Sequence, residues 1–396
     1  MRKIKVFHII AKLELGGAQR VTLATLAGLD RKMFEPGLIT GIQGMLVPEA
    51  KKIPGLKCYL IPSFIREISI IKDITALYHI YRILKKERVD IVHTHGSKGG
   101  VLGRIAAFLA RVPIAIHSVH GFSFNEHIPF FRRWFYIIIE WFCSFFTDHF
   151  FLDSKGNIER GLRFRILTGR SYSQLPPGIE LDPFRKRRIN PVSERERLGL
   201  SPGDEVVLTI SCLKPQKAPQ DFVKMAALVA EKRAKAKFLL VGDGELRPEV
   251  ERLIRELDLE GKVLLLGWQW DVLPLLTIAD VFVLTSLWEG LPTVIPMAYA
   301  AGKPVVATEV DGSKEVVIPG ETGFLVPPHD VAGLAEKVSF LLSHPGKAKD
   351  MGEKGRKLAQ RYDIKKMIEK QRAFYLKIYK NQGKRRLFLD QSGGKG

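Results

Sequence analysis

The sequence is poor in cysteine and contains no long uninterrupted apolar run. Its three cysteines, Cys58, Cys143 and Cys212, are odd in number and widely spaced over 396 residues. This pattern argues against both a disulfide framework and a cysteine-based zinc site. The N-terminus carries basic residues but only a short apolar run, so it predicts a first strand and not a signal peptide. Together these absences favour a protein of the reducing cytoplasm.

Signatures of nucleic-acid binding are also absent, although the net charge is +20. There is no helix-turn-helix pattern, no zinc finger and no aromatic RNA-binding motif. The charge is uneven: residues 1–185 carry +12, residues 186–346 carry −3 and residues 347–396 carry +11. We therefore expect one electropositive face whose partner is an anionic lipid surface or a polyanionic acceptor, and no nucleic acid.

The most aromatic stretch, residues 122–152, is too interrupted to cross a membrane. Charged residues at Arg132, Arg133, Glu140 and Asp148 divide it into runs well below the roughly 20 residues that a spanning helix needs. A helix that starts after Pro129 could pack in the core, or it could lie at a membrane interface or bind a lipid-linked acceptor. The sequence leaves both alternatives open. The protein is therefore expected in the cytoplasm, either free or on the inner face of the cell membrane.

Apolar strands alternate with helical segments, and this alternation restarts in the second half of the chain. Such a pattern is typical of parallel sheets covered by helices on both faces, and the length favours two domains. The predicted fold class is α/β, with two facing Rossmann-like domains and a cleft between them. The predicted boundaries are 1–178, 179–362 and 363–396, and a Pro-rich linker is expected at 171–191. Strands are expected at 4–11, 36–41, 57–62, 90–95, 114–119 and 149–153, and then at 206–211, 237–241, 263–266, 281–284, 305–308 and 324–326.

Ligands of parallel sheets collect at the carboxyl ends of the strands, where this sequence places glycines and histidines. Gly16 and Gly17 follow the first strand, an arrangement that lets the backbone approach a phosphate or a sugar. His95 and His120 end two further strands. A histidine there can serve a ligand, or it can only cap the following turn. For His95 capping is the favoured interpretation.

One acidic side chain, Glu289, follows the strand at 281–284 and precedes a helix. Because prolines at 292 and 296 are tolerated only at a helix start, the helix should open near Thr293 and end at about residue 302. Gly290 lets the backbone approach a bound group, and the N–H groups of the helix start favour an anion. A phosphate there, with a polar group on Glu289, would suit a phosphorylated sugar. The alternative is an ordinary strand–helix unit with a glycine turn.

Several separated motifs together resemble glycosyltransferase family 4, a family of retaining nucleotide-sugar transferases. In chain order they are Gly16-Gly17, His120-Gly121, Lys214-Pro-Gln-Lys217, Gly242-Asp-Gly-Glu245, Asp280, Glu289-Gly-Leu-Pro292, Ala300–Ala307, Gly312 with Glu315, and Glu321–Pro327. The resemblance runs from the first strand to about Tyr362. It implies a GT-B fold with an acceptor-binding first domain, a donor-binding second domain and a basic tail that returns to the first. It also implies a nucleotide-diphosphate sugar as substrate, no cofactor or metal, and a lipid-linked or polysaccharide acceptor.

Carried over position by position, the resemblance implies catalytic roles for three residues. Lys217 would neutralise the diphosphate leaving group, Glu289 would hydrogen-bond hydroxyls of the donor sugar, and His120 would touch the sugar near the reacting carbon. The positions that would bind substrate are Gly16, Gly17, Lys217, Gly242, Gly290, Leu291, Pro292 and Thr293.

Two positions depart from the family pattern, and both concern the nucleotide. Met297 stands where the family has a second glutamate that holds the ribose, and Cys212 stands where it tends to have an arginine on the diphosphate. Losing one charge-assisted contact to phosphate costs about 1.5–3 kcal/mol. We predict an active hexosyl-type transferase. The alternatives are a degenerate GT-B module that binds a glycan, a lipid or a partner enzyme, and a nucleotide-sugar epimerase, whose carboxylate acid/base set is not evident.

Overall fold

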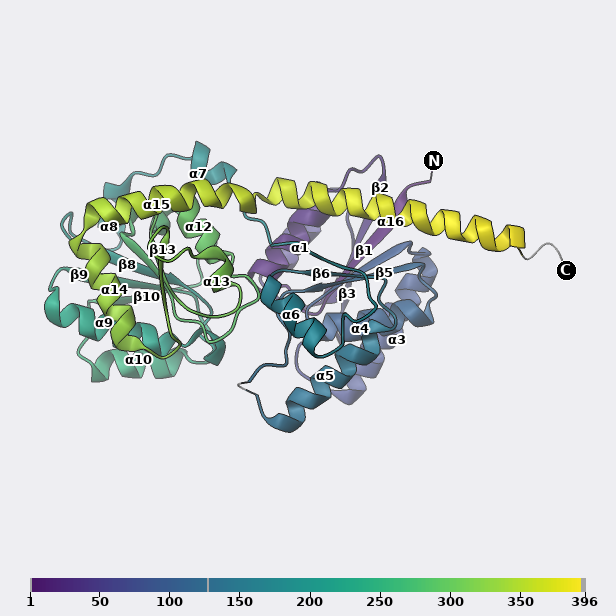
Figure 1. Cartoon of the computed structure of the whole chain (residues 1–396), viewed down its shortest axis with the longest axis horizontal. Coiled ribbons are helices and arrows are strands. Elements are labelled where there is room, and N and C mark those ends of the chain that lie inside the picture. The colour runs from purple at the N-terminus through teal and green to yellow at the C-terminus, as the bar shows by residue number, and fades with distance from the viewer. Residues whose placement is uncertain (1, 127, 393–396) are drawn as a thin grey trace. The chain divides into compact units, whose positions relative to one another are not determined.

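The computed structural model describes residues 2–126 and 128–392, with side chains described up to residue 382. The chain forms two compact units (Figure 1). The first unit consists of Met1–Gly178 and Ile364–Gly396, and the second unit consists of Ile179–Asp363. The last four residues of the expected tail, 393–396, lie outside the described residues.

The first unit is built on a seven-stranded sheet with the order β3-β2-β1-β4-β5-β6-β7, in which all paired strands are parallel. The strands are β1 Ile4–Ile10, β2 Phe34–Gly41, β3 Lys57–Ile61, β4 Ile91–His95, β5 Ile114–Val119, β6 His149–Leu152 and β7 Tyr172–Gln174. The helices are α1 Gly17–Gly28, α2 Val47–Lys52, α3 Ile70–Glu87, α4 Ser97–Leu109, α5 Phe130–Ser144, α6 Lys155–Arg163 and α16 Ile364–Ser392.

The second unit is built on a six-stranded parallel sheet with the order β10-β9-β8-β11-β12-β13. The strands are β8 Glu205–Ile210, β9 Ala236–Val241, β10 Val263–Gly267, β11 Val281–Leu284, β12 Val305–Thr308 and β13 Gly323–Val326. The helices are α7 Asp182–Lys186, α8 Pro191–Arg197, α9 Pro219–Lys232, α10 Arg247–Glu256, α11 Leu273–Ile278, α12 Val294–Ala300, α13 Ser313–Val316, α14 Val331–Ser343 and α15 Pro345–Ala359, with short 3-10 turns at Pro215–Lys217 and Gln360–Tyr362.

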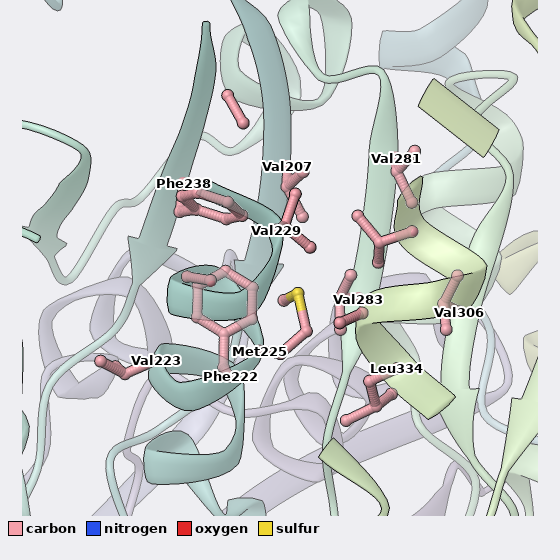
Figure 2. Packing of buried hydrophobic residues seen from close by; sticks show 14 of the residues in the cluster. Val207, Phe222, Val223, Met225, Val229, Phe238, Val281, Val283, Val306 and Leu334 are labelled. Atoms are coloured by element: carbon pink, nitrogen blue, oxygen red, sulfur yellow. The ribbon is translucent and has the colours of Figure 1, made fainter. Parts of the chain in front are cut away.

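Both faces of each sheet are buried, which explains why the strands are continuous apolar runs and not alternating ones. In the second unit, the neighbours Val206 and Val207 belong to different hydrophobic clusters, one on each face. Figure 2 shows one of these clusters, in which side chains of α9 pack against the strands and Leu334 of α14. This packing holds the strands rigidly, so the loops at their carboxyl ends start from fixed positions.

Each sheet has one topological switch point, where the strand order reverses. It lies between β1 and β4 in the first unit and between β8 and β11 in the second. In open parallel sheets, ligands bind at the carboxyl ends of the two strands that flank such a point. The predicted α/β class is confirmed, and the predicted strands agree with the observed ones within two residues at each end.

One predicted segment is wrong in part. The expected linker at 171–191 begins with β7, which pairs with β6 and is continued by a bond from Leu175 N to Leu152 O of 2.9 Å. The last two helices belong to different units: α15 packs against α12 in the second unit, and α16 packs against α1 in the first. Helix α15 stays with the second unit because it packs closely on α12: a Cβ on Gly352 of α15 would lie 1.9 Å from Gly302 O, just after α12.

Helix α5 lies in the aromatic stretch, and it turns its apolar side outward. Its buried residues are Ile137, Glu140, Cys143 and Ser144. Its exposed large side chains are Phe130, Phe131, Trp134, Phe135, Ile138, Trp141 and Phe142. The alternative of a core helix is therefore wrong. None of the helices in the described part of the chain is long and apolar enough to cross a membrane.

Candidate active site

The polar centre of the second unit is an ion pair between Lys217 and Glu289. Lys217 ends the 3-10 turn after β8, and Glu289 lies in the loop after β11, so the pair lies at the switch point of this sheet. The two side chains are only 16% and 7% exposed. Burial lowers the pKa of the Lys217 ammonium, but the interactions with Glu289 and Cys212 together outweigh burial, and the pKa is raised overall. Lys217 is therefore a cation held in a largely dry site.

The loops that carry these two residues are tied to each other by hydrogen bonds. The Thr285 hydroxyl donates to Lys217 O at 2.8 Å and to Ala218 O at 3.1 Å. Leu287 N donates to Gln216 O at 2.8 Å, and the Gln216 side chain donates to the carbonyl oxygen of Trp288 at 2.8 Å. These bonds fix the ammonium and the carboxylate relative to each other before any ligand binds.

The Glu289 carboxylate is oriented by a second donor. The Ser286 hydroxyl donates to Glu289 Oε1 at 2.6 Å, and Oε1 is also the oxygen that contacts Lys217. Within the described structure both donors use this one oxygen, so Oε2 is the atom left to accept a hydrogen bond from a ligand. The main chain is held as well, because Glu289 N donates to Asp311 Oδ2 at 3.3 Å.

Glycines allow the neighbouring loops to approach the Lys217 segment. Gly242 has φ +127°, and a Cβ there would lie 2.0 Å from Ser211 O. A Cβ on Gly244 would lie 2.5 Å from Leu213 O, and one on Gly312 would lie 2.1 Å from Gly290 O. Gly242, which was predicted as a substrate contact, is therefore needed for packing: only a glycine at this position lets the loop lie against the segment that leads to Lys217.

The helix after Glu289 starts and ends as the sequence indicates. Thr293 is the N-cap residue of α12, although its side chain makes no capping hydrogen bond, and Gly302 has φ +73° just after the helix. Leu291 and Pro292 precede the cap, and the Leu291 side chain belongs to a hydrophobic cluster. The backbone of residues 291–293, rather than its side chains, is therefore what this segment offers to a ligand.

The two departures from the family pattern differ in their surroundings. Cys212 lies near enough to Lys217 to influence its pKa, so it borders the polar centre. Met297 is half-buried on α12 and packs against the hydrophobic cluster on that face of the sheet. Met297 is therefore a packing residue in this unit.

In the first unit, Gly16 is the N-cap residue of α1 and Gly17 is its first residue, at the end of the connection that follows β1. His120 follows β5 with a side chain that is 13% exposed. Its Nδ1 lies 3.1 Å from Asp153 Oδ2, and its Nε2 lies 3.1 Å from His95 Nδ1. His95 is buried and bonded to His120, so the interpretation of His95 as a turn cap is wrong.

The structure therefore brings the predicted residues together in two groups. Lys217 and Glu289 meet in the second unit, and His120 meets His95 in the first. Sequence reasoning missed the residues that hold them: Thr285, Ser286 and Asp311 beside Glu289, and His8 and Asp153 beside the histidines. A usable signal existed in each case, because all of these residues lie at or just beyond the carboxyl end of a parallel strand.

Comparison with known proteins gives the family. Residues 15–182 match the family described as Glycosyltransferase Family 4, and residues 193–358 match the one described as Glycosyl transferases group 1. The chain is 34% identical over 337 residues to the UDP-Gal:alpha-D-GlcNAc-diphosphoundecaprenol alpha-1,3-galactosyltransferase of Escherichia coli. This match covers 83% of this chain and 85% of that relative. It is 30% identical over 334 residues to the N-acetyl-alpha-D-glucosaminyl L-malate synthase of Bacillus anthracis, over 78% and 80% of the two chains.

A solved structure shows the same fold. HepE of Anabaena, crystallised in complex with UDP and glucose, aligns over 95% of this chain and 100% of its own with a TM-score of 0.81 at 20% identity. Two Rossmann-like domains of this kind define the GT-B fold. The chain belongs to glycosyltransferase family 4, and it is a glycosyltransferase.

Proposed function

We propose that this protein transfers a hexosyl unit from a UDP-sugar to a saccharide carried on a polyprenol diphosphate, with retention of configuration and without a metal. The observation that carries the proposal is the buried Lys217–Glu289 pair at the switch point of the second unit. The activity named for the Escherichia coli relative, which uses UDP-Gal and a diphosphoundecaprenol acceptor, supports the donor and acceptor classes. The complex of HepE with UDP and glucose supports a UDP-linked donor.

Each residue of the polar centre has a task in this reaction. When the glycosidic bond of the donor breaks, negative charge develops on the leaving diphosphate. The Lys217 ammonium and the backbone N–H groups of Leu291 and Thr293 stabilise that charge, with Gly290 and Gly242 giving room for close approach. Glu289 Oε2 accepts a hydrogen bond from a hydroxyl of the donor sugar. In the first unit, Gly16 and Gly17 admit the phosphates, and His120 touches the sugar.

The test measures released UDP with UDP-Gal, UDP-Glc, UDP-GlcNAc and GDP-Man, each with GlcNAc-diphosphoundecaprenol as acceptor. Glu289→Gln keeps the shape of the side chain but removes its charge, and it should lower kcat by about 100- to 1,000-fold. Glu309→Gln makes the same change at an exposed glutamate of the second unit, whose ion pair with Lys314 spans 3.4 Å, and it should leave kcat unchanged.

Four outcomes would count against the proposal. Full activity in Glu289→Gln would remove the site, and binding of UDP-sugars without any turnover would favour a degenerate binding module. A product with inverted anomeric configuration, or activity lost in EDTA and restored by Mg²⁺, would overturn retention or metal independence respectively.

We further propose that the first unit binds the surface of an anionic membrane through α5 and the start of α3. Figure 1 shows α3, α4 and α5 side by side in this unit. Phe131 on α5 is 86% exposed, and Ile70 and Ile71 on α3 are 76% and 80% exposed. Residues 1–185 carry a net charge of +12. An exposed aromatic helix on a basic unit is suited to lipid headgroups of negative charge, where a lipid-linked acceptor would be found.

Flotation with phosphatidylglycerol-containing and neutral vesicles, at low and high salt, tests this attachment. The wild-type protein should float with anionic vesicles at low salt, and Phe131→Glu should weaken binding about tenfold or more because a charge replaces a ring that enters the headgroup layer on binding. Val192→Glu is the matched control, since Val192 is 57% exposed in the second unit. Protein that stays at the bottom with every vesicle would refute the attachment.

A further inference from the structure

One face of the sheet in the first unit changes from apolar to polar toward the carboxyl ends of its central strands. On β1 the side chains Ile4 and Val6 are followed by His8, and on β4 Ile91 is followed by His93 and His95. On β5 Ile114 and Ile116 are followed by Ser118. Because strand side chains alternate with a period of two, these polar groups share the face that α16 covers. They are buried, between 0% and 5% exposed.

These groups form one continuous hydrogen-bonded chain that starts at Asp153. It runs from Asp153 Oδ2 to His120 Nδ1, from His120 Nε2 to His95 Nδ1 and from His95 Nε2 to His8 Nδ1, with distances of 3.1, 3.1 and 2.8 Å. His8 Nε2 then lies 3.1 Å from the hydroxyl of Tyr375 on α16.

The hydrogen-bonded chain continues beyond Tyr375 into the interior of the unit. The Tyr375 hydroxyl also contacts His93 Nδ1, and His93 Nε2 lies 2.8 Å from the Ser118 hydroxyl. Tyr375 is 0% exposed. A single hydroxyl from the C-terminal helix therefore joins the imidazoles of two neighbouring strands.

The carboxylate at one end gives the chain a direction. An ionised Asp153 can only accept, so His120 donates from Nδ1 and its Nε2 accepts from His95. The same rule then passes along the chain: His95 and His8 each donate from Nδ1, Tyr375 donates to His8, and His93 donates from Nδ1 to Tyr375. This direction needs the Gln371 amide, 3.1 Å from His93 Nδ1, to present its oxygen to that nitrogen.

We propose that Tyr375, His8 and His95 are positioning residues that hold the His120 ring against Asp153 with its proton fixed on Nδ1. The inference rests on the proposed function, in which His120 touches the sugar. His120 is the most exposed imidazole of this hydrogen-bonded chain, and Asp153 alone does not set its position, because one hydrogen bond leaves the ring some freedom to tilt about that bond. The second bond, from His95, removes that freedom.

Burial keeps the inner members of the chain neutral, as the direction requires. Burial lowers the pKa of His8 to about 3, and it holds the pKa values of His93 and His95 well below their usual range. His117 and Arg104 face the sheet from its other side, where His117 Nδ1 lies 2.9 Å from the Thr94 hydroxyl. These groups do not interrupt the chain.

A metal ion is the competing occupant of this cluster. Among the described residues, His8, His93 and His95 are the group whose ligand atoms come within 4.8 Å of one another. Yet both ring nitrogens of His8 and both of His95 are already used in the chain. A metal would have to break the bond between these two rings, so metal content is a direct test against the proposal.

The experiment compares Tyr375→Phe with the wild type by ¹⁵N NMR of labelled histidine and by transfer kinetics. The variant keeps the ring and removes only the hydroxyl. Tyr379→Phe is the control, since it makes the same change at a half-buried tyrosine one turn further along α16. Four wild-type rings, assigned with His→Asn variants, should show a protonated Nδ1: His8, His93, His95 and His120. In Tyr375→Phe the Nε2 of His8 and the Nδ1 of His93 lose the hydroxyl, so the ¹⁵N shifts of these two rings should change, while Asp153 still fixes the Nδ1 proton of His120 and His95. With His8 held less firmly, kcat should fall about 5- to 10-fold with the donor KM within twofold.

The NMR result stands independently of the reaction. If the wild type transfers no sugar, the proposed function fails, while the four Nδ1–H rings would still support the chain. A protonated Nε2 on wild-type His8 or His95, or a Tyr375→Phe spectrum and kcat equal to those of Tyr379→Phe, would overturn the proposal. So would one equivalent of zinc in the purified protein whose removal changes the histidine spectrum.

Discussion

Removing Glu140 on α5 should strongly destabilise the first unit. Arg104 on α4 is 0% exposed, and its guanidinium donates to Glu140 Oε2 at 2.7 Å and to Gly100 O at 2.8 Å. The Glu140 side chain is only 7% exposed. In Glu140→Ala the guanidinium stays buried without its counter-charge, since water cannot reach it in place of the carboxylate.

The expected loss follows from this burial. Breaking a buried pair by removing one partner costs about 3–5 kcal/mol. For a unit of this size each kcal/mol corresponds to about 2–4 °C in Tm, so the first unit should melt roughly 6–20 °C lower. Glu140→Gln retains an acceptor for Arg104 and should lose less. Replacing both partners with apolar residues, as in Arg104→Met with Glu140→Leu, should recover most of the loss.

The assay is thermal unfolding followed by circular dichroism and by tryptophan fluorescence, to which Trp134 and Trp141 on α5 contribute. Glu159→Ala, at an exposed position on the neighbouring α6, is the control and should change Tm by no more than 2 °C or so. The reasoning is refuted if Glu140→Ala melts with the control, or if the apolar double variant is less stable than Glu140→Ala.

Three further predictions concern the second unit, acid stability and the nucleotide site. Gly244→Ala places a Cβ 2.5 Å from Leu213 O, so the segment before Lys217 must shift. We expect the free energy of unfolding in urea to fall by about 1–3 kcal/mol and the donor KM to rise. Wild-type values for both would contradict this packing explanation. Burial lowers the pKa of His8 to about 3 and that of His149 to about 4, below the unfolded value near 6.5, so their contribution to stability is complete above pH 6.5 and is lost toward pH 3. The free energy of unfolding from urea titrations should fall by about 1.4 kcal/mol per pH unit for each histidine below pH 6, and a flat profile from pH 7 to 4.5 would exclude this effect. Cys212→Arg adds a charge beside Lys217 for the diphosphate and should raise kcat/KM for the donor about 10- to 100-fold, whereas no gain would mean that the diphosphate does not reach residue 212.

The fold and the outline of the donor site follow from local features of the sequence. Continuous apolar runs separated by helical segments predict parallel strands, because such strands are buried on both faces. Glu289 could be found from its position after a strand, and the two prolines beside it fix where α12 starts. Lys217 came from the motif resemblance, and the structure adds the reason for its position, which is the set of bonds from Thr285 and Leu287.

Contacts between distant segments could not be predicted in this way. Tyr375 meets His8 across 367 positions of sequence, and nothing in the local pattern of α16 indicates which tyrosine faces the sheet. The packing reason for Gly242 is of the same kind, since it depends on the loop at Ser211. Strand β7 could not be predicted because its three residues, Tyr172–Gln174, are too few to show a periodic pattern of apolar side chains.

The orientation of α5 is the most informative difference between local pattern and structure. By hydrophobicity alone, its phenylalanine and tryptophan side chains would turn to the core. They do not, because the opposite side carries Glu140, which can be buried only against Arg104. An ion pair of this kind adds little net stability compared with apolar packing, so its effect is to select one rotation of the helix. That rotation leaves Phe131 and Trp134 exposed on the unit that also holds His120. The buried charges of α4 and α5 and the aromatic surface are thus two sides of one arrangement, and losing Glu140 should impair vesicle binding along with stability.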